Sequence, residues 1–164
     1  ADFALIDQGG QPVTRTDLAG QVWIADFIFT RCGSTCPRMT AAMAELAHAL
    51  GERPGIRLVS ITVDPEHDSP AVLAEYAGRY GADPARWLFL TGERPAIERL
   101  ARESFHLAAG EGDAAGGGEP FLHSTRLVLV DREGRIRGTY DGTDVARVRA
   151  LRADLEALLA EKPS

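Results

Sequence analysis

Apolar positions along the chain predict a sheet of several strands. Runs of mostly apolar, β-favouring residues are typical of strands buried on both faces of a sheet. Near the N-terminus, two short segments within residues 3–14 instead flank Gly9-Gly10, which favours a hairpin. The predicted strands are 21–29, 56–63, 87–91 and 125–131, followed by a turn at Glu133-Gly134 and an edge strand over 135–140.

Apolar residues that recur three or four positions apart predict helices between and after these strands. Proline at the first turn supports two of them, because it lacks the N–H that would be unbonded there. The expected helices run from near Pro37 to Gly51, from Pro70 after an N-cap at Ser69, over 93–105, and from a cap at Asp144. The last helix should place Val145, Val148, Leu151, Leu155 and Leu158 on one apolar face.

The order of these elements predicts the fold class. Strands that alternate with helices favour a mostly parallel central sheet with helices on both faces. An antiparallel pair near the end, followed by a closing helix, makes the expected α/β fold thioredoxin-like, with an added N-terminal β-hairpin. No repeat is visible, so residues 1–164 are expected to form a single thioredoxin-like domain.

Charge and composition narrow the class of function. The net charge is −6 and the pI is about 5.2, which argues against a nucleic-acid partner because such proteins carry a basic face. No apolar run reaches the roughly 18 residues needed to span a bilayer, and no signal peptide is visible. A cytosolic protein, a mature secreted protein and a soluble fragment cut from an anchor all fit these observations.

The chain has only two cysteines, Cys32 and Cys36, between a predicted strand and a predicted helix. The helix start favours negative charge, and Arg31 and Arg38 add positive charge, so the pKa of a thiol here should fall. Two thiolates form a soft site that prefers Cu(I), or else zinc. The alternative of two reduced core cysteines is disfavoured, because the flanking Arg, Gly, Ser, Thr and Pro residues are poor core residues.

Of the four histidines, His123 is the candidate third ligand. It follows a glycine-rich stretch over 110–120 and immediately precedes a predicted strand. In dithiol oxidoreductases of this fold that position holds a cis-proline beside the cysteines, whereas here the nearest proline is Pro120. Two sulfurs and an imidazole would complete a three-coordinate Cu(I) site or most of a Cu(II) site. His48, His67 and His106 fit helix or turn positions instead.

Three further features give weaker evidence about the site, and each has both a functional and a structural interpretation. Asp64 either accepts a hydrogen bond near the metal or begins an Asp-Pro turn, and the turn is favoured. Met39 and Met43 either contact copper or pack in the core, and packing is favoured. The glycine-rich stretch is either a gate for His123 or plain disorder.

Several of these segments, in this order, resemble the Sco/SenC family of copper-binding proteins that serve cytochrome c oxidase assembly. The cysteine spacing with the downstream histidine is specific, and the other pieces are weak alone; Gly33 replaces a proline that the family often has. The matching pieces are Phe29-Thr30-Arg31-Cys32, Cys36-Pro37, Val63-Asp64-Pro65-Glu66-His67-Asp68-Ser69-Pro70, Leu90-Thr91-Gly92, His123-Ser124 and Leu127-Val128-Leu129-Val130-Asp131.

The resemblance implies a thioredoxin-like copper chaperone with Cys32, Cys36 and His123 as metal ligands. Such a protein would deliver one copper ion, as Cu(I) or Cu(II), to the CuA centre of cytochrome c oxidase subunit II or exchange it with another copper chaperone. The alternative function is a thiol-disulfide oxidoreductase that reduces the cysteines of the oxidase copper site, with Cys32 and Cys36 as its redox-active pair. Family members are usually tethered to a membrane, so a periplasmic, anchored full-length protein is expected.

Overall fold

A strand in which all seven residues are buried lies at the centre of the fold. This strand, β3 (Val22–Ile28), is the middle strand of a five-stranded sheet. The order of the strands is β5 (Trp87–Leu90), β4 (Ile56–Thr62), β3, β6 (Arg126–Val130) and β7 (Ile136–Asp141). The computed structural model describes residues 4–28, 30, 35–50, 55–83, 86–100, 126–142 and 144–160. A strand buried on both faces needs cover on both sides of the sheet, as its sequence predicted.

The sheet is mixed. β4 (Ile56–Thr62) pairs parallel with β3, and β5 (Trp87–Leu90) pairs parallel with β4. β6 (Arg126–Val130) is antiparallel to β3, and β7 (Ile136–Asp141) is antiparallel to β6 at the edge. The carboxyl ends of β3, β4 and β5 therefore lie at one edge of the sheet, and β6 begins at that edge.

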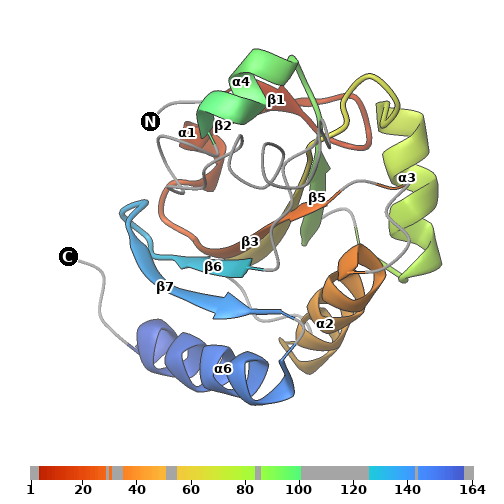
Figure 1. The fold of residues 1–164 in the computed structure, drawn as a ribbon. Helices are drawn as coiled ribbons and strands as arrows, with labels where there is room; N and C mark the ends of the chain where they lie inside the picture. Colours follow the sequence, from red (N-terminus) through yellow and green to blue (C-terminus); the bar gives the residue numbers. More distant parts are fainter. Residues whose placement is uncertain are drawn as a thin grey trace, which may run out of the picture.

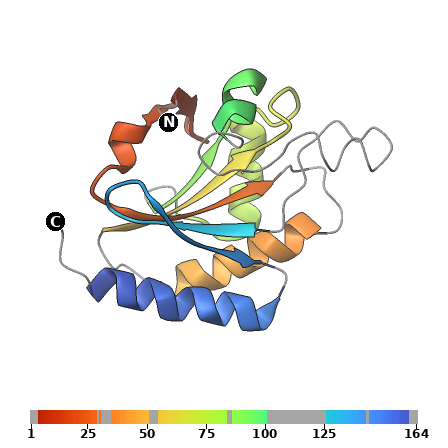
Figure 2. The same cartoon turned by 60° about the vertical axis from the view of Figure 1, so that its left-hand side comes forward.

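Helices cover both faces of this sheet. Figures 1 and 2 show α2 (Thr35–Leu50) and α6 (Val145–Ala160) on one side, and the short α1 (Arg15–Leu18) and α4 (Arg94–Arg99) on the other. α3 (Pro70–Arg79) follows β4 and precedes β5. The helices on both faces agree with the sequence-based expectation.

Helix α2 packs in the core through apolar side chains and makes a buried polar contact with α3. Met39 and Met43 of α2 are fully buried in the core, at the helical spacing that the sequence indicated. The Thr40 hydroxyl on α2 lies 2.9 Å from the Tyr76 hydroxyl on α3. This contact gives two buried hydroxyl groups a partner where α2 and α3 meet.

The predicted N-terminal hairpin is confirmed and covers the edge of β5. β1 (Ala4–Ile6) and β2 (Pro12–Thr14) pair antiparallel. The Gln8 side chain accepts a hydrogen bond from the Phe89 N–H at 2.9 Å and donates one to the Trp87 carbonyl oxygen at 3.0 Å. Backbone groups of an edge strand that would otherwise invite pairing with another chain are thereby occupied.

Three local features differ from the sequence prediction. α1 was not predicted, although Asp17 accepts a hydrogen bond from the Thr14 N–H at 2.7 Å in the manner of a helix cap. α2 begins at Thr35, two residues before Pro37. Val145, expected on the apolar face of α6, is 67% exposed, whereas Leu151, Leu155 and Leu158 of that face are buried.

Candidate metal site

Cys36 occupies the second position of α2, so its backbone lies in the first turn of that helix. Its side chain lies outside the described part of the structure, as do Cys32 and His123. The first turn of α2 carries no acidic residue. Unpaired N–H groups at a helix start stabilise a thiolate, and no carboxylate of this turn opposes that effect.

The strands that flank the predicted ligands in sequence share one edge of the sheet. β3 ends at Ile28, ahead of Cys32, and β6 begins at Arg126, shortly after His123. Because β3 and β6 are antiparallel neighbours, the end of the first lies at the same edge as the start of the second. The chain therefore leaves β3 and enters β6 at the same edge of the sheet.

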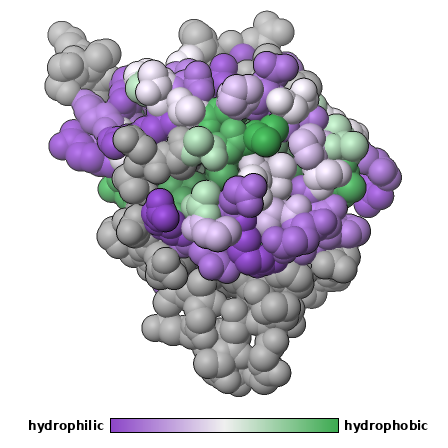
Figure 3. Space-filling view, turned by 90° about the horizontal axis from the view of Figure 1, so that it is seen from above, coloured by the Kyte–Doolittle hydropathy of each residue, from purple (hydrophilic) through white to green (hydrophobic). Residues whose placement is uncertain are grey.

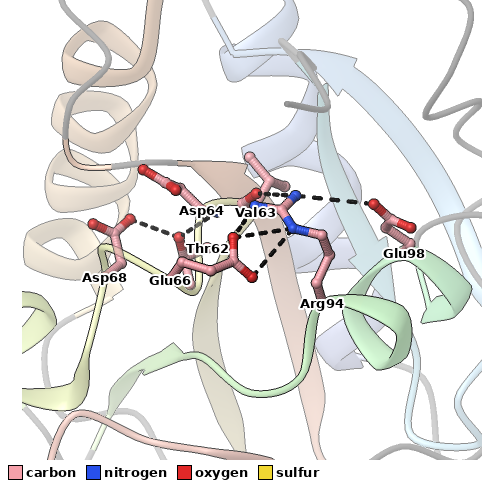
Figure 4. A network of polar contacts seen from close by, with 7 residues as sticks. All are labelled: Thr62, Val63, Asp64, Glu66, Asp68, Arg94 and Glu98. Carbon is pink, nitrogen blue, oxygen red and sulfur yellow. Dashed lines mark hydrogen bonds and ion pairs between the residues drawn. The ribbon is translucent and has the colours of Figure 1, made fainter. Parts of the chain in front are cut away.

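Asp68 is a fully buried residue at this edge. Its carboxylate accepts a hydrogen bond from the Thr62 hydroxyl at 2.6 Å (Figure 4) and another from the Thr30 N–H at 3.0 Å. The Thr30 hydroxyl also donates to Asp68. Asp68 thus joins the segment just after β3 to the end of β4. The Nε2 atom of His67, a largely exposed side chain, lies 3.9 Å from this carboxylate.

A second polar network at this edge centres on Arg94 of α4. Its Nε atom lies 3.0 and 3.2 Å from the two carboxylate oxygens of Glu66, and its Nη1 donates to the Val63 carbonyl oxygen at 3.3 Å (Figure 4). Glu98 lies 3.9 Å from Nη1. The hydrogen bonds from Arg94 lower the pKa of Glu66. Arg94 therefore connects the loop after β4 to α4 through these hydrogen bonds.

Asp64 begins a turn, as the favoured interpretation of the sequence predicted. Its carbonyl oxygen accepts hydrogen bonds from the N–H groups of His67 at 3.1 Å and Asp68 at 2.8 Å. Its own N–H donates to the Thr62 hydroxyl at 3.0 Å. The side chain is buried just beyond the end of β4. A role as acceptor for a metal ligand stays a prediction.

Asp26, in the middle of β3, was missed by the sequence analysis. It is fully buried and accepts a hydrogen bond from the Ser60 hydroxyl at 2.5 Å, and Ser60 in turn accepts one from the Trp87 Nε1–H at 3.0 Å. Within the described residues Asp26 Oδ2 has no hydrogen-bond partner. Burial raises the pKa of Asp26 to about 7, against the lowering effect of the Ser60 hydrogen bond. The available signal was a lone carboxylate in an otherwise apolar strand.

Two of the other histidines lie where the sequence predicted them, in a helix and in a turn. His48 is exposed near the far end of α2, and His67 lies in the turn before α3. His106 lies outside the described residues, as does the glycine-rich stretch 110–120. In the part of the chain that the structure describes, no three His, Cys, Asp or Glu side chains group so as to hold a metal. Nor is any helix of that part both long enough and apolar enough to cross a membrane.

A family model described as SCO1/SenC matches residues 1–160. The chain belongs to the SCO1/SenC family. The SCO1 protein homolog of Bacillus subtilis (strain 168) is 36% identical over 144 residues, which cover 87% of this chain and 73% of the relative. A putative copper-binding protein of Stutzerimonas stutzeri is 32% identical over 139 residues, covering 82% of this chain and 65% of the relative. The chain thus spans about two thirds to three quarters of these SCO1/SenC relatives.

Solved structures of the family share the fold of this chain. A SCO1/SenC lipoprotein from Bacillus anthracis has a TM-score of 0.85 at 30% identity, covering 97% of this chain and 94% of that one. BsSco, a member of the Sco family of cytochrome c oxidase assembly proteins with a disulfide switch, gives 0.82 at 34% identity, with 99% and 94% covered. Copper-bound ScoI of Bradyrhizobium japonicum gives 0.78 at 26% identity, with 96% and 98% covered.

These similarities confirm two sequence-based predictions. The resemblance to the Sco/SenC family is correct. The fold is the α/β, thioredoxin-like fold of the Sco proteins, with helices on both faces of the sheet and an added N-terminal hairpin. The family includes copper-bound members and assembly proteins of cytochrome c oxidase.

Proposed function

We propose that this chain is a copper chaperone that binds one copper ion through Cys32, Cys36 and His123. The observation that carries the proposal is the shared edge of the sheet. β3 ends ahead of Cys32 and β6 begins shortly after His123, and both of these points belong to that edge, while Cys36 is in the first turn of the helix that follows β3 in sequence. The copper-bound ScoI structure and the copper-binding relative support copper as the metal.

The chemistry of the three side chains suits a metal that must be passed on. Soft thiolates favour Cu(I), and an imidazole accepts either Cu(I) or Cu(II). A low coordination number leaves room for a ligand of a partner to join before the donor ligands leave. The proposed acceptor is the CuA centre of cytochrome c oxidase subunit II, and another copper chaperone is the proposed exchange partner. The family's role in oxidase assembly supports this direction of transfer.

Copper titration of the reduced protein tests the ligand set. The wild type should take up one tightly bound copper, and Cys32→Ala, Cys36→Ala and His123→Ala should each weaken it. His48→Ala is the matched control, because His48 is exposed near the opposite end of α2. The Cu(II) form should show a sulfur-to-copper charge-transfer band that both cysteine variants alter. Wild-type affinity in His123→Ala would remove the histidine from the ligand set.

Delivery is a separate claim and needs its own experiment. Copper-loaded protein is mixed with a copper-free CuA domain, and the copper content of the re-isolated acceptor reports transfer. The acceptor should fill when the reduced donor is loaded with copper, and it should stay empty when Cys36→Ala replaces the donor. A loaded wild-type protein that keeps its copper in the presence of a competent acceptor would contradict delivery.

A second function, thiol-disulfide exchange with the oxidase cysteines, is supported by the disulfide switch of BsSco. In this reaction one cysteine thiolate attacks the disulfide of the acceptor, and the other cysteine resolves the mixed disulfide. The test uses copper-free reduced protein and an oxidised CuA domain. Loss of the acceptor disulfide, with a matching gain of disulfide in this chain, would establish it. No exchange over the time in which copper is delivered would exclude it.

The remaining expectations concern the whole protein. We propose that the full-length product is periplasmic and held at a membrane, which the lipoprotein relative from Bacillus anthracis supports. Fractionation of cells that express the full-length product, with detection in the membrane and soluble fractions, tests this localisation. That residues 1–164 form one domain stays a prediction, and a single unfolding transition by two independent probes would support it.

A further inference from the structure

We infer that Asp68 is a positioning residue for the segment that carries Cys32. This inference rests on the proposed copper site, and it assigns a function to a residue that holds no metal itself. Asp68 lies between the turn after β4 and the first residue of α3, 36 positions away from Cys32 in sequence. Two of the hydrogen bonds to its carboxylate nevertheless come from Thr30, which lies between β3 and Cys32 in sequence.

The geometry at Asp68 uses both carboxylate oxygens. Oδ2 accepts the Thr62 hydroxyl at 2.6 Å and the Thr30 N–H at 3.0 Å, and Oδ1 accepts the Thr30 hydroxyl. The carboxylate is held from its own side as well, because the Asp68 N–H donates to the Asp64 carbonyl oxygen at 2.8 Å. With a side chain that is 0% exposed, Asp68 has no bulk water to replace a lost donor.

The hydrogen bonds between Thr30 and Asp68 lie just beyond the last backbone hydrogen bond between β3 and β4. The Val63 N–H donates to the Ile28 carbonyl oxygen at 2.8 Å, which is the backbone bond that closes the β3–β4 ladder at this edge. Two residues further along, both hydrogen-bond donors of Thr30 go to Asp68. Thr30 in turn is two residues before Cys32. The point from which the cysteine segment departs is therefore fixed by Asp68.

The contacts at Asp68 are strongest with a carboxylate. Three donors converge on Asp68, and a carboxylate offers two acceptor oxygens and no donor. The amide of Asn has nearly the same shape, but it keeps all three contacts only if its oxygen faces the Thr62 hydroxyl and the Thr30 N–H and the Thr30 hydroxyl turns round to accept from its NH2 group. Those bonds lack the charge of the carboxylate and are weaker, so Thr30 should be held less firmly to Thr62. The consequence should be a looser cysteine pair.

The test compares Asp68→Asn with Asp131→Asn. Asp131 is also buried, but it lies at the other edge of the sheet, in the turn between β6 and β7. Copper affinity is measured by competition with a Cu(I) chelator, and the equilibrium between the cysteine pair and glutathione is measured without copper. Asp68→Asn should weaken copper binding by about tenfold or more and shift the thiol–disulfide equilibrium, whereas Asp131→Asn should leave both within about twofold.

Thr30→Val supplies the second variant, because it removes one donor to Asp68 and should fold even where Asp68→Asn does not. It should change copper affinity in the same direction and by a smaller factor. Unchanged affinity and unchanged thiol–disulfide equilibrium in folded Asp68→Asn, or in Thr30→Val, would overturn the positioning function. A wild type that binds no stoichiometric copper would instead overturn the proposed function, while the glutathione equilibrium would still decide on Asp68.

Discussion

Two buried aspartates at opposite edges of the same sheet make hydrogen bonds of different range. Asp131 binds within its own turn, accepting the N–H groups of Glu133 and Arg135, each at 2.9 Å. Asp68 binds the hydroxyl of Thr62, which is six positions away, and Thr30, which is 38 positions away. Asp131 therefore shapes one hairpin, whereas Asp68 fixes two segments of the sheet relative to each other at the candidate metal site.

Asp26 supplies the contrasting case in the middle of the sheet. Asp68 accepts hydrogen bonds at both of its carboxylate oxygens. Asp131 accepts hydrogen bonds from two backbone N–H groups. Asp26 accepts one from Ser60, and its Oδ2 has no partner in the described part of the chain. Burial of a carboxylate is costly when too few donors accompany it. The three aspartates should accordingly respond differently to pH and to substitution.

Asp26→Asn should show the largest effect, as a change in pH dependence. Burial raises the pKa of Asp26 to about 7 in the folded protein, so between its ordinary value of 3.8 and 7 the folded state binds more protons than the unfolded state. The stability of the wild type relative to Asp26→Asn should therefore fall by up to about 4 kcal/mol as the pH rises from 4 to 8. Urea unfolding of both proteins at several pH values measures this difference.

A constant difference in the free energy of unfolding between wild type and Asp26→Asn, from pH 4 to pH 8, would contradict the raised pKa. Ser60→Ala is a matched control for the neighbouring hydrogen bond. It removes the donor that opposes the effect of burial, so the pKa of Asp26 should rise further in this variant. The free energy of unfolding should then depend more steeply on pH at the alkaline end than it does in the wild type.

Asp131→Asn should have the opposite sign and a smaller magnitude. Burial alone would raise the pKa of Asp131, but the N–H groups of Arg135 and Glu133 and the Arg137 guanidinium outweigh it and hold that pKa below its usual value. The carboxylate thus stabilises the fold at neutral pH, and this stabilisation is lost as the pH falls below about 4. We expect a loss of about 2 kcal/mol at pH 7, which narrows in acid. An equal loss at pH 7 and pH 3 would refute this account.

A double-mutant cycle on Thr30→Val and Thr62→Val sharpens the comparison at the Asp68 edge. Both hydroxyls donate to one carboxylate, so removing either should change the cost of removing the other. We expect an interaction free energy of about 1 kcal/mol in urea unfolding. Additive losses would mean that Asp68 holds the two segments independently and does not couple them.

The smallest effect is expected for Arg94→Met. Arg94 binds Glu66 in a network at the candidate-site edge, yet the Glu66 side chain is 63% exposed. Exposed ion pairs contribute less than about 1 kcal/mol and are screened by salt. The loss of stability should therefore shrink in high salt, and copper affinity should stay at the wild-type value. A large loss of copper binding in this variant would place Arg94 among the residues that organise the site.

The fold was predictable from the sequence because its signals are local. A mostly apolar run predicted β3, and Ser69 with Pro70 predicted the start of α3, where Ser69 Oγ accepts the Val72 N–H at 3.3 Å. Val145 was placed wrongly, since helical periodicity alone does not show whether the first turn of a helix is covered by the rest of the fold.

The candidate site was predictable in part. The cysteine spacing and the histidine before a strand predicted three ligands and a metal, and strand order supports their common edge. The contact of Asp68 with Thr30 was not predictable, because it joins residues 38 positions apart and depends on the pairing of β3 with β4. The contact of Asp26 with Ser60 likewise depends on the pairing of β3 with β4 and not on its neighbours in sequence.

The position of β6 has a consequence for the order in which the chain is assembled. β6 pairs with the side of β3 that β4 leaves open, and it is encoded far downstream. As the chain folds, β3 can pair with β4, and Asp68 can bind Thr30, before β6 takes its place. A partly folded chain of this kind leaves an apolar strand edge of β3 unpaired, which is an aggregation hazard until β6 covers it.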